Sequence, residues 1–341
     1  MRVAMYYNNR DVRLEEMPEP KIGPGEILVK ILATGICGSD VMEWYRLSKA
    51  PLVLGHEIAG EIVRTGEGVG KLKPGDRVTV AHHVPCNTCR YCLSGRHSMC
   101  DTLRSTTFDP GGFAEFLRVP AINVDRGTFL LPEGISYEEG SFAEPLACVY
   151  RGQRLAGFRP GSTVFVIGSG ISGMIHIHLA STLGAGRVIA TDINKYRLEM
   201  AGRFGADAVF EAGDDMADRL REANHGRLAD IVILCTAAPQ AVSQAFRTVD
   251  RGGTILLFAC SQWGMDVPVP LWDLWRDGIT VTSSYAGPPE DTSTALELIA
   301  SGRMRLKDMI THRLPLAEAA DGFRLVEDGG ECLKVIIEPH R

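Results

Sequence analysis

The first 124 residues contain short runs in which apolar and polar residues alternate. Clear examples are residues 26–35 (EILVKILATG), 57–66 (EIAGEIVRTG) and 76–83 (DRVTVAHH), which are separated by turns rich in glycine and proline. An alternating pattern of this kind is typical of strands with one buried face. We therefore predict an antiparallel, β-rich domain, with a short helix near residues 40–47.

After residue 160 the pattern changes to apolar runs separated by helical stretches. The runs cover residues 162–168, 187–193, 206–212, 230–236, 252–259 and 279–285. Apolar strands that alternate with helices indicate a parallel sheet with right-handed crossovers. The sequence therefore predicts a second domain of the doubly wound α/β class, with about six strands.

The junction between the two patterns has a helix-start signal. Ser136 and Glu139 form an S-x-x-E capping box before an apolar stretch, so a helix is expected to carry the chain across the domain boundary. Beyond it, the last ~55 residues predict helices at 291–300 and 317–326 and a closing strand at 332–339. The pattern alone leaves open which domain this last part joins.

Composition narrows the range of functions. A chain of 341 residues exceeds the size at which one hydrophobic core stops growing, so two domains are expected. The net charge of −6 argues against nucleic-acid binding, and no apolar run reaches membrane-spanning length. The N-terminal residues lack a signal-peptide core. We therefore expect a cytoplasmic protein without a nucleic-acid or membrane partner.

Four of the nine cysteines lie close together in the sequence. Cys86, Cys89, Cys92 and Cys100 are separated by two, two and seven residues, a spacing that suits a tetrahedral zinc ion. The first two gaps also match the cysteine spacing of bacterial ferredoxins, which bind iron–sulfur clusters. The gap of seven does not match that spacing, and Asp101 stands where a proline would follow the last cysteine. Disulfides are the other alternative. Because four sulfurs leave no position for a substrate, the expected zinc is structural. The remaining cysteines are scattered singly: Cys37, Cys148, Cys235, Cys260 and Cys332.

A glycine motif indicates a dinucleotide site. Gly168, Gly170 and Gly173 form G-x-G-x-x-G directly after a predicted strand and at the start of a helix, where unpaired N–H groups can bind a pyrophosphate. Asp192 ends the next strand, where an acidic residue binds the ribose hydroxyls and repels a 2′-phosphate; Ile193, not an arginine, follows it. NAD is therefore favoured over NADP. The expected cofactor-binding residues are Gly168, Gly170, Ile171, Ser172, Gly173, Asp192 and Arg197.

Three further segments contain metal-ligating side chains. They are residues 35–40 (GICGSD), 54–62 (LGHEIAGEI) and 142–147 (FAEPLA). Taken singly, Cys37 and His56 are as often ordinary buried residues, and no second histidine completes a metalloprotease H-E-x-x-H motif after His56. Together, a cysteine, a histidine and a carboxylate are a set that a catalytic zinc accepts with its fourth position open.

With these motifs the chain resembles the zinc-dependent medium-chain dehydrogenase/reductase family over essentially its whole length, in particular its sorbitol and threonine dehydrogenase branch. The resemblance implies a GroES-like catalytic domain (1–152 and 289–341, with a zinc lobe at about 82–104), a Rossmann NAD-binding domain (153–288), and an active site in the cleft. It also implies two zinc ions per subunit and a homodimer or homotetramer. The implied ligands of the catalytic zinc are Cys37, His56 and Glu57 or Glu144, and those of the structural zinc are Cys86, Cys89, Cys92 and Cys100.

The resemblance implies oxidation of a secondary alcohol, a polyol or a cyclic sugar alcohol, by hydride transfer to NAD. Zinc lowers the pKa of a bound alcohol in the same way as it lowers the pKa of bound water, which falls to about 7. Ser39 would bond the substrate hydroxyl and remove its proton. We expect Glu57 and Glu144 to share the ligand role, with Glu144 held extended by Pro145.

The chain departs from the family at Met42, where a histidine commonly completes the proton relay; Glu43 is a candidate replacement. Trp44, Phe108, Phe113 and Tyr285 are guesses for the substrate pocket. Three alternatives remain: a threonine-type amino-alcohol dehydrogenase, a zinc-free enoyl or quinone reductase of the same fold, and a zinc-lobe binding module without catalysis.

Overall fold

The computed structural model describes residues 1–259 and 261–341, and the chain divides into two units. One unit comprises Met1–Ala147 together with Ala286–Arg341, and the other comprises Cys148–Tyr285. The predicted boundaries were 152/153 and 288/289. Cys260, expected to be a single free cysteine, lies outside the described residues.

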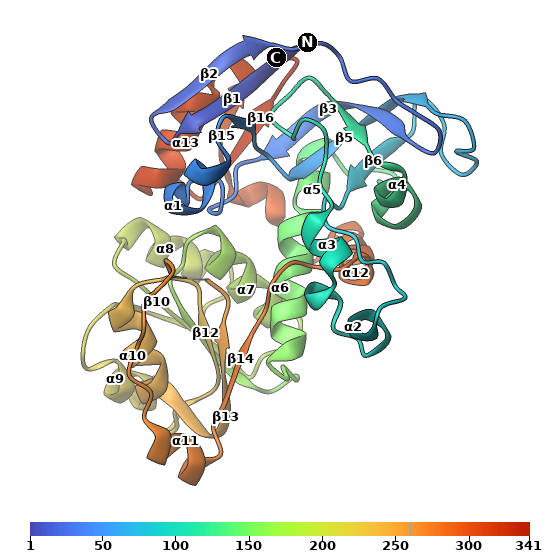
Figure 1. The fold of residues 1–341 in the computed structure, drawn as a ribbon. Coiled ribbons are helices and arrows are strands. Elements are labelled where there is room, and N and C mark those ends of the chain that lie inside the picture. Colours follow the sequence, from blue (N-terminus) through green and yellow to red (C-terminus); the bar gives the residue numbers. More distant parts are fainter. Residues whose placement is uncertain (260) are drawn as a thin grey trace. The chain divides into compact units, whose positions relative to one another are not determined.

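The first unit is built around two sheets (Figure 1). The larger sheet is antiparallel except for one parallel pair of strands, β15 with β16, and the smaller sheet is antiparallel. In order, the larger sheet contains β15 (Ile310–Pro315), β16 (Lys334–Glu338), β3 (Ile27–Gly35), β5 (Glu57–Thr65), β6 (Arg77–Val80) and β8 (Thr128–Leu130), with β7 (Phe116–Val119) also on β3, and the smaller sheet contains β2 (Asp11–Glu16), β1 (Arg2–Asn8) and β4 (Leu52–Val53).

The C-terminal strands complete the N-terminal sheet. Strand β16 pairs with the end of β3, where Ile336 lies opposite Gly35. One buried core joins Tyr6 and Phe113 with Phe323, which comes from helix α13 (Ala319–Asp328). The last part of the chain therefore returns to the first unit, a point that the sequence pattern left open.

Short helices connect the strands of the first unit. The capping box predicted at Ser136 and Glu139 is present at the start of α5 (Tyr137–Ser141). The expected single helix is interrupted at Phe142, because Pro145 has no N–H to bond the carbonyl of Ser141. The other α-helices of this unit are α1 (Glu43–Arg46), α2 (Arg90–Leu93), α3 (Asp101–Ser105), α4 (Ala121–Gly127) and α12 (Pro289–Ala300). Helix α6 (Ala143–Leu155) leads from the first unit into the second.

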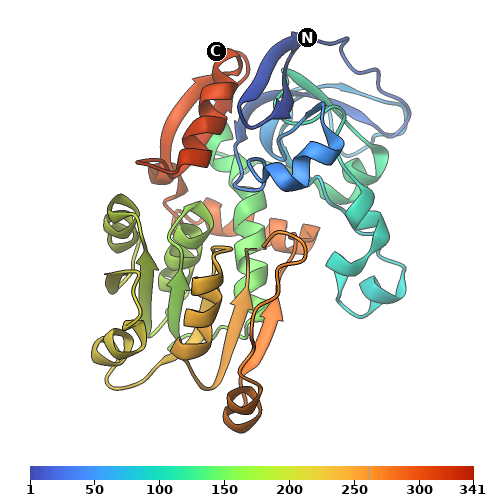
Figure 2. The same cartoon turned by 60° about the vertical axis from the view of Figure 1, so that its left-hand side comes forward.

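The second unit is a doubly wound parallel sheet with the strand order β11-β10-β9-β12-β13-β14. All five residues of the central strand β9 are buried, as its apolar run predicts. In Figure 2 the gold helix α10 lies in front of the strands. The strands are β9 (Thr163–Ile167), β10 (Arg187–Asp192), β11 (Ala208–Glu211), β12 (Ala229–Leu234), β13 (Val249–Leu257) and β14 (Thr280–Ser283), and the helices are α7 (Ile171–Thr182), α8 (Lys195–Arg203), α9 (Met216–Ala223), α10 (Pro239–Thr248) and α11 (Leu271–Asp277).

This strand order is that of a Rossmann domain. The predicted fold class, a β-rich domain plus a doubly wound parallel sheet, is confirmed. Among the described residues, no helix combines the length and hydropathy needed to cross a membrane.

Candidate active site and zinc lobe

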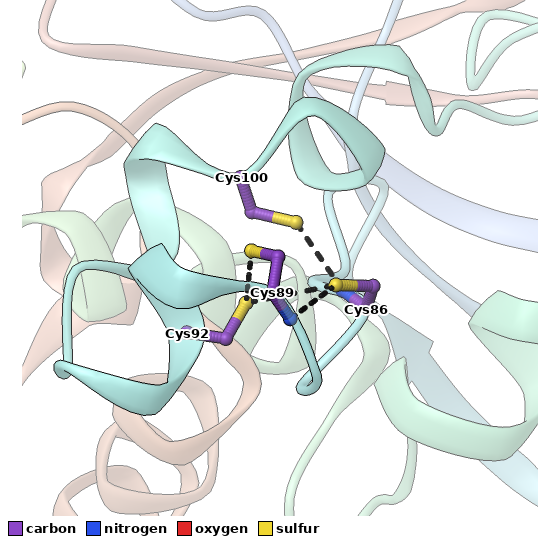
Figure 3. Close-up of side chains that lie close together, drawn as sticks. All are labelled: Cys86, Cys89, Cys92 and Cys100. Carbon is purple, nitrogen blue, oxygen red and sulfur yellow. Dashed lines mark hydrogen bonds between the residues drawn. The ribbon is translucent and has the colours of Figure 1, made fainter.

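The four clustered cysteines converge on one point (Figure 3). Their sulfurs all lie within 4.8 Å of one another, with Cys89 Sγ 3.5 Å and Cys86 Sγ 4.0 Å from Cys92 Sγ. Four sulfurs at ~2.3 Å from a tetrahedral zinc would be about 3.8 Å apart, so the residues fit this ion.

The backbone beside Cys86 favours a thiolate, whereas burial raises the pKa of Cys92 to about 12. The N–H groups of Thr88 and Cys89 point at Cys86 Sγ, at 3.5 and 3.3 Å. Hydrogen bonds from the Thr88 hydroxyl and from these backbone groups lower the pKa of Cys86 to about 5. Only Leu103, among the described residues, joins the buried Cys92 and Cys100 in the core of this lobe, so a metal would supply much of its stability.

A second potential metal site lies in the first unit and contains Cys37, His56 and Glu57. One ligating atom from each residue lies within 4.8 Å of the others. Cys37 follows the end of β3, and Glu57 opens β5, which pairs with β3 through Gly35 and Glu57. Strand pairing therefore brings together two segments that are 20 residues apart in sequence.

Adjacent residues of a regular strand would point to opposite faces, yet His56 and Glu57 both reach this site. The chain turns at Gly55, whose φ of +97° a side chain rarely adopts. A Cβ there would also lie 2.8 Å from the backbone nitrogen of Phe113. The glycine before His56 therefore permits the kink that brings both side chains to one site.

Asp40 is a buried carboxylate behind the cysteine and the histidine. Its Oδ2 accepts a hydrogen bond of 3.0 Å from the Cys37 N–H, and its Oδ1 lies 3.5 Å from His56 Nδ1. Burial alone would lower the pKa of His56, but the Asp40 charge and hydrogen bond hold it well above its usual value. With Nδ1 turned to Asp40, Nε2 of His56 remains for a metal, which is a common arrangement around zinc.

Glu57 has a second buried partner. Its side chain forms an ion pair with Lys334 of β16, and both residues are at most 1% exposed. The Lys334 ammonium also donates to the carbonyl of Ile36 at 3.1 Å. Glu57 is thus available to a metal only at the expense of its ion pair with Lys334.

Glu144 lies in the first turn of α6. The described residues grouped as potential metal ligands with Cys37 and His56 do not include it. The expectation that Pro145 holds Glu144 extended is wrong, because a proline is tolerated in the first turn of a helix, where its missing N–H has no partner.

Ser39 lies beside the proposed metal site, and its N–H points at Cys37 Sγ at 3.5 Å. Met42 is the N-cap of α1. The Glu43 carboxylate accepts the backbone N–H of Asn9 at 3.1 Å, so it is directed toward β1's end rather than toward Ser39. Arg46 instead reaches back and donates to the Ser39 hydroxyl at 3.1 Å.

The glycine turn in the second unit has the geometry that its motif requires. Gly168 has a φ of +92°, and a Cβ on Gly173 would lie 1.9 Å from the carbonyl oxygen of Gly168. A Cβ on Gly170 would approach only the guanidinium of Arg197, at 3.7 Å. The backbone at Gly170 is therefore open to a pyrophosphate, and Ile171 and Ser172 begin α7 beside it.

Asp192 ends β10 and is 7% exposed. Its two carboxylate oxygens accept the N–H groups of Ser169 at 2.6 Å and Asn194 at 2.9 Å. This side chain therefore ties the glycine turn to the end of the next strand, in addition to any contact with a ribose.

The guessed pocket residues differ in burial and come from both units. Phe108 and Phe113 are core residues, 4% and 1% exposed. Trp44 lies in α1, whereas Tyr285 belongs to the second unit and is 49% exposed. The sequence interpretation did not single out Asp40, Arg46 and Lys334 as individual residues. Lys334 had a signal, since it is the one charge inside the apolar run of the closing strand, and Asp40 lay within the quoted GICGSD motif.

Comparisons with known proteins agree with this geometry. Residues 23–126 match the alcohol dehydrogenase GroES-like domain, and residues 172–301 match the zinc-binding dehydrogenase domain. A probable D-xylulose reductase A of Neosartorya fischeri is 34% identical, covering 96% of this chain and 93% of that protein. A sorbitol dehydrogenase of Bacillus subtilis is 31% identical, covering 100% and 98%.

Solved structures agree as well. The alcohol dehydrogenase TADH from Thermus sp. ATN1 superposes with a TM-score of 0.88 at 31% identity, covering 99% of both chains. Both matched domains, the full-length relatives and the two cysteine-containing sites lead to the same assignment. The chain belongs to the zinc-dependent medium-chain dehydrogenase/reductase family.

Proposed function

We propose that this protein oxidises a secondary alcohol of a polyol to the ketone, with NAD as the hydride acceptor. The observation that carries the proposal is the group of Cys37, His56 and Glu57 with the Ser39 hydroxyl beside it. Relatives named sorbitol dehydrogenase and D-xylulose reductase support a polyol rather than an amino alcohol.

Each side chain has a distinct part in this proposal. Cys37 and His56 hold the zinc, and Asp40 fixes the ring of His56. When bound, zinc lowers the pKa of the substrate hydroxyl. Ser39 accepts the hydroxyl proton, and in the second unit the glycine turn, Asp192 and Arg197 bind the dinucleotide.

The carboxylate ligand is proposed to be Glu57 or Glu144, with the choice depending on whether water or substrate is bound. Glu57 lies in the metal-ligand group, while its ion pair with Lys334 holds it in competition with a metal. Zinc content and turnover of Glu57→Gln and Glu144→Gln test this point. Near-normal values in both variants would remove the two carboxylates from the ligand set.

The activity test is an NADH-production assay with zinc-loaded protein on sorbitol, xylitol, inositol, 2,3-butanediol and threonine. We expect the polyols to give the highest kcat/KM and Cys37→Ser to be inactive. A preference for threonine would favour the amino-alcohol alternative. Quinone reduction by protein that holds no zinc at Cys37 and His56 would instead indicate the reductase class without a catalytic zinc.

We also infer that two copies pair through the edge of the Rossmann sheet. Strand β14 is the last strand of that sheet, and a set of exposed apolar side chains lies on it and on the chain segments that flank it in sequence, including α11. An open edge with apolar side chains is a site for pairing, and two identical edges can pair about a twofold axis. The set contains Trp263, Leu271, Trp272, Trp275, Val281 and Tyr285.

Light scattering after size-exclusion chromatography tests the pairing. The double variant Trp272→Glu/Trp275→Glu should shift the protein toward monomer. Leu14→Glu, which changes a 45% exposed leucine in β2, is the matched control and should not. An unchanged mass in the double variant would contradict the inference.

A cytoplasmic location is part of the same proposal. No disulfide joins the described cysteines, including the three outside both clusters, Cys148, Cys235 and Cys332. Proteins of a reducing compartment rarely contain disulfides. Fractionation of cells that express the tagged protein would test this location.

A further inference from the structure

Arg46 and Ser39 form a contact that the proposed chemistry has not yet used. The Nη2 of Arg46 donates to Ser39 Oγ at 3.1 Å, and its Nε donates to the carbonyl oxygen of the same serine at 2.9 Å. One guanidinium therefore binds both the side chain and the backbone of Ser39.

The guanidinium is itself held firmly. Its Nη2 lies 3.5 Å from the buried carboxylate of Asp40, and its carbon lies 4.9 Å from the centre of the Tyr45 ring. The Arg46 side chain is only 14% exposed. Helix α1 turns the chain so that Arg46, seven residues after Ser39, faces back toward it.

This contact limits what the Ser39 hydroxyl can do. A serine hydroxyl has one proton to donate and two lone pairs that accept. An arginine can only donate, and it stays charged at every accessible pH. Arg46 therefore occupies one lone pair, and the hydroxyl retains one lone pair and its proton. The hydroxyl proton must point away from the guanidinium.

Three neighbouring side chains are not placed to hold the Ser39 hydroxyl in this way. Met42 carries no acidic proton, and the Glu43 carboxylate is bonded to the backbone of Asn9. Lys49, on the same helical segment, lies against the Tyr45 ring with its ammonium 4.6 Å from the ring centre. Among these residues, Arg46 is the one that contacts Ser39.

We propose that Arg46 is a positioning residue for proton removal, which fixes Ser39 so that it accepts the substrate proton and passes its own proton outward. The inference rests on the proposed function, because it requires Ser39 to contact the substrate hydroxyl. In the step, the substrate O–H bond breaks and its proton bonds to the free lone pair of Ser39 Oγ. The original Ser39 proton leaves to water. With hydride transfer to NAD⁺, the products are a ketone, NADH and one proton.

The Arg46 charge supports the same step electrostatically. Negative charge develops on Ser39 Oγ as its own proton leaves ahead of the arriving substrate proton, and this charge lies within hydrogen-bond distance of a guanidinium in a largely buried setting. An arginine cannot relay the proton itself, so the outward step must use water. Arg46 therefore does not carry the proton, and its effect on the reaction comes from positioning Ser39.

The experiment compares Arg46→Met, Arg46→Lys, Ser39→Ala and the double variant Ser39→Ala/Arg46→Met, all loaded with zinc and NAD and assayed on sorbitol, or on the best alcohol of the panel if sorbitol is not oxidised. We expect Arg46→Met to lose roughly 10- to 100-fold in kcat and to show a larger solvent isotope effect. Arg46→Lys should recover part of the loss. In the Ser39→Ala background, Arg46→Met should change kcat by less than about twofold, because the two residues act as one unit.

Two controls separate positioning from a purely structural role. Lys49→Met changes a cation on the same segment and should leave kcat unchanged. Added guanidinium should restore part of the turnover of Arg46→Met, whereas it would not repair a damaged fold. Zinc content and thermal unfolding are measured for every variant.

The inference is overturned if the effects of Ser39→Ala and Arg46→Met multiply, or if the loss in both Arg46→Met and Arg46→Lys follows the loss of zinc or of folded protein. Failure of the wild-type enzyme to oxidise any alcohol in the panel would overturn the proposed function, and this inference with it. An active wild type with no coupling overturns only the role of Arg46.

Discussion

At the scale of single residues, the buried pair of Lys334 and Glu57 is an ion pair whose loss should be costly. Glu57→Gln would leave the Lys334 ammonium buried without its countercharge, with only neutral acceptors such as the Ile36 carbonyl beside it among the described residues. We expect a loss of about 3–5 kcal/mol in the free energy of unfolding, measured by urea titration. Glu57→Gln/Lys334→Met removes both charges and should recover much of it. Equal stability of the two variants would contradict this account.

His176 gives a pH-dependent prediction. It is fully buried in α7, and burial lowers its pKa to about 3 from the usual 6.5. Below pH ~6.5 the unfolded chain binds a proton here that the folded chain does not, so stability falls as the pH falls. By pH 4.5 this single group should cost roughly 3 kcal/mol.

The measurement is the free energy of unfolding of wild type and His176→Leu between pH 7 and 4.5. The wild type should lose more stability than the variant as the pH is lowered. His225→Asn changes an exposed histidine and should follow the wild type. Parallel curves for wild type and His176→Leu would show that His176 does not cause the acid sensitivity.

Asp192 should affect both cofactor choice and the glycine turn. Asp192→Ser removes the charge that opposes a 2′-phosphate, so the NADP/NAD ratio of kcat/KM should rise by on the order of tenfold. It also removes the acceptors of the Ser169 and Asn194 N–H groups, which should lower stability by about 1–3 kcal/mol. Asp192→Asn, which keeps one acceptor oxygen, is the matched control. An unchanged cofactor ratio would mean that the ribose site is elsewhere.

At the scale of elements, the zinc lobe should depend on its metal more than any other segment. Cys86, Cys89, Cys92 and Cys100 form most of its small core, which a few apolar contacts could not hold together alone. Strong chelation should therefore expose residues 82–104 to proteolysis while both sheets persist. Hydrogen exchange followed by mass spectrometry would check this, and protection of the lobe without zinc would contradict it.

At the scale of the whole molecule, the two units should be separable in function. Cys37 lies in the first unit, and the glycine turn and Asp192 lie in the second. Cys37→Ser should abolish alcohol oxidation yet leave the Kd for NADH within about threefold of wild type. Fluorescence titration measures this, and loss of NADH binding would show that the two functions are coupled.

Metal removal should also proceed in two stages. A site with one thiolate and an open position holds zinc less tightly than four sulfurs do. Mild chelation should therefore abolish activity with one zinc retained and the circular dichroism spectrum unchanged. Activity that falls only in step with unfolding would count against two distinct sites.

Features that depend on local spacing could be predicted from the amino-acid sequence. The cysteine gaps, the glycine motif after an apolar strand and the Ser136–Glu139 capping box each lie within one short segment, so their geometry follows from nearby residues. The alternation of apolar strands and helices likewise predicted the Rossmann sheet, because strands and helices follow one another along the chain and the central strands are buried.

Contacts between residues that are distant in sequence could not be predicted in this way and became visible in the folded chain. The pairing of β16 with β3 lets Lys334 form an ion pair with Glu57. The turn at Gly55 brings His56 and Glu57 to one site. Helix α1 turns back so that Arg46 donates a hydrogen bond to Ser39. Pro145, from which the sequence predicted an extended Glu144, lies in a helix. Such contacts depend on strand register and helix orientation, which arise from packing across the whole unit and leave no periodic signal in the sequence.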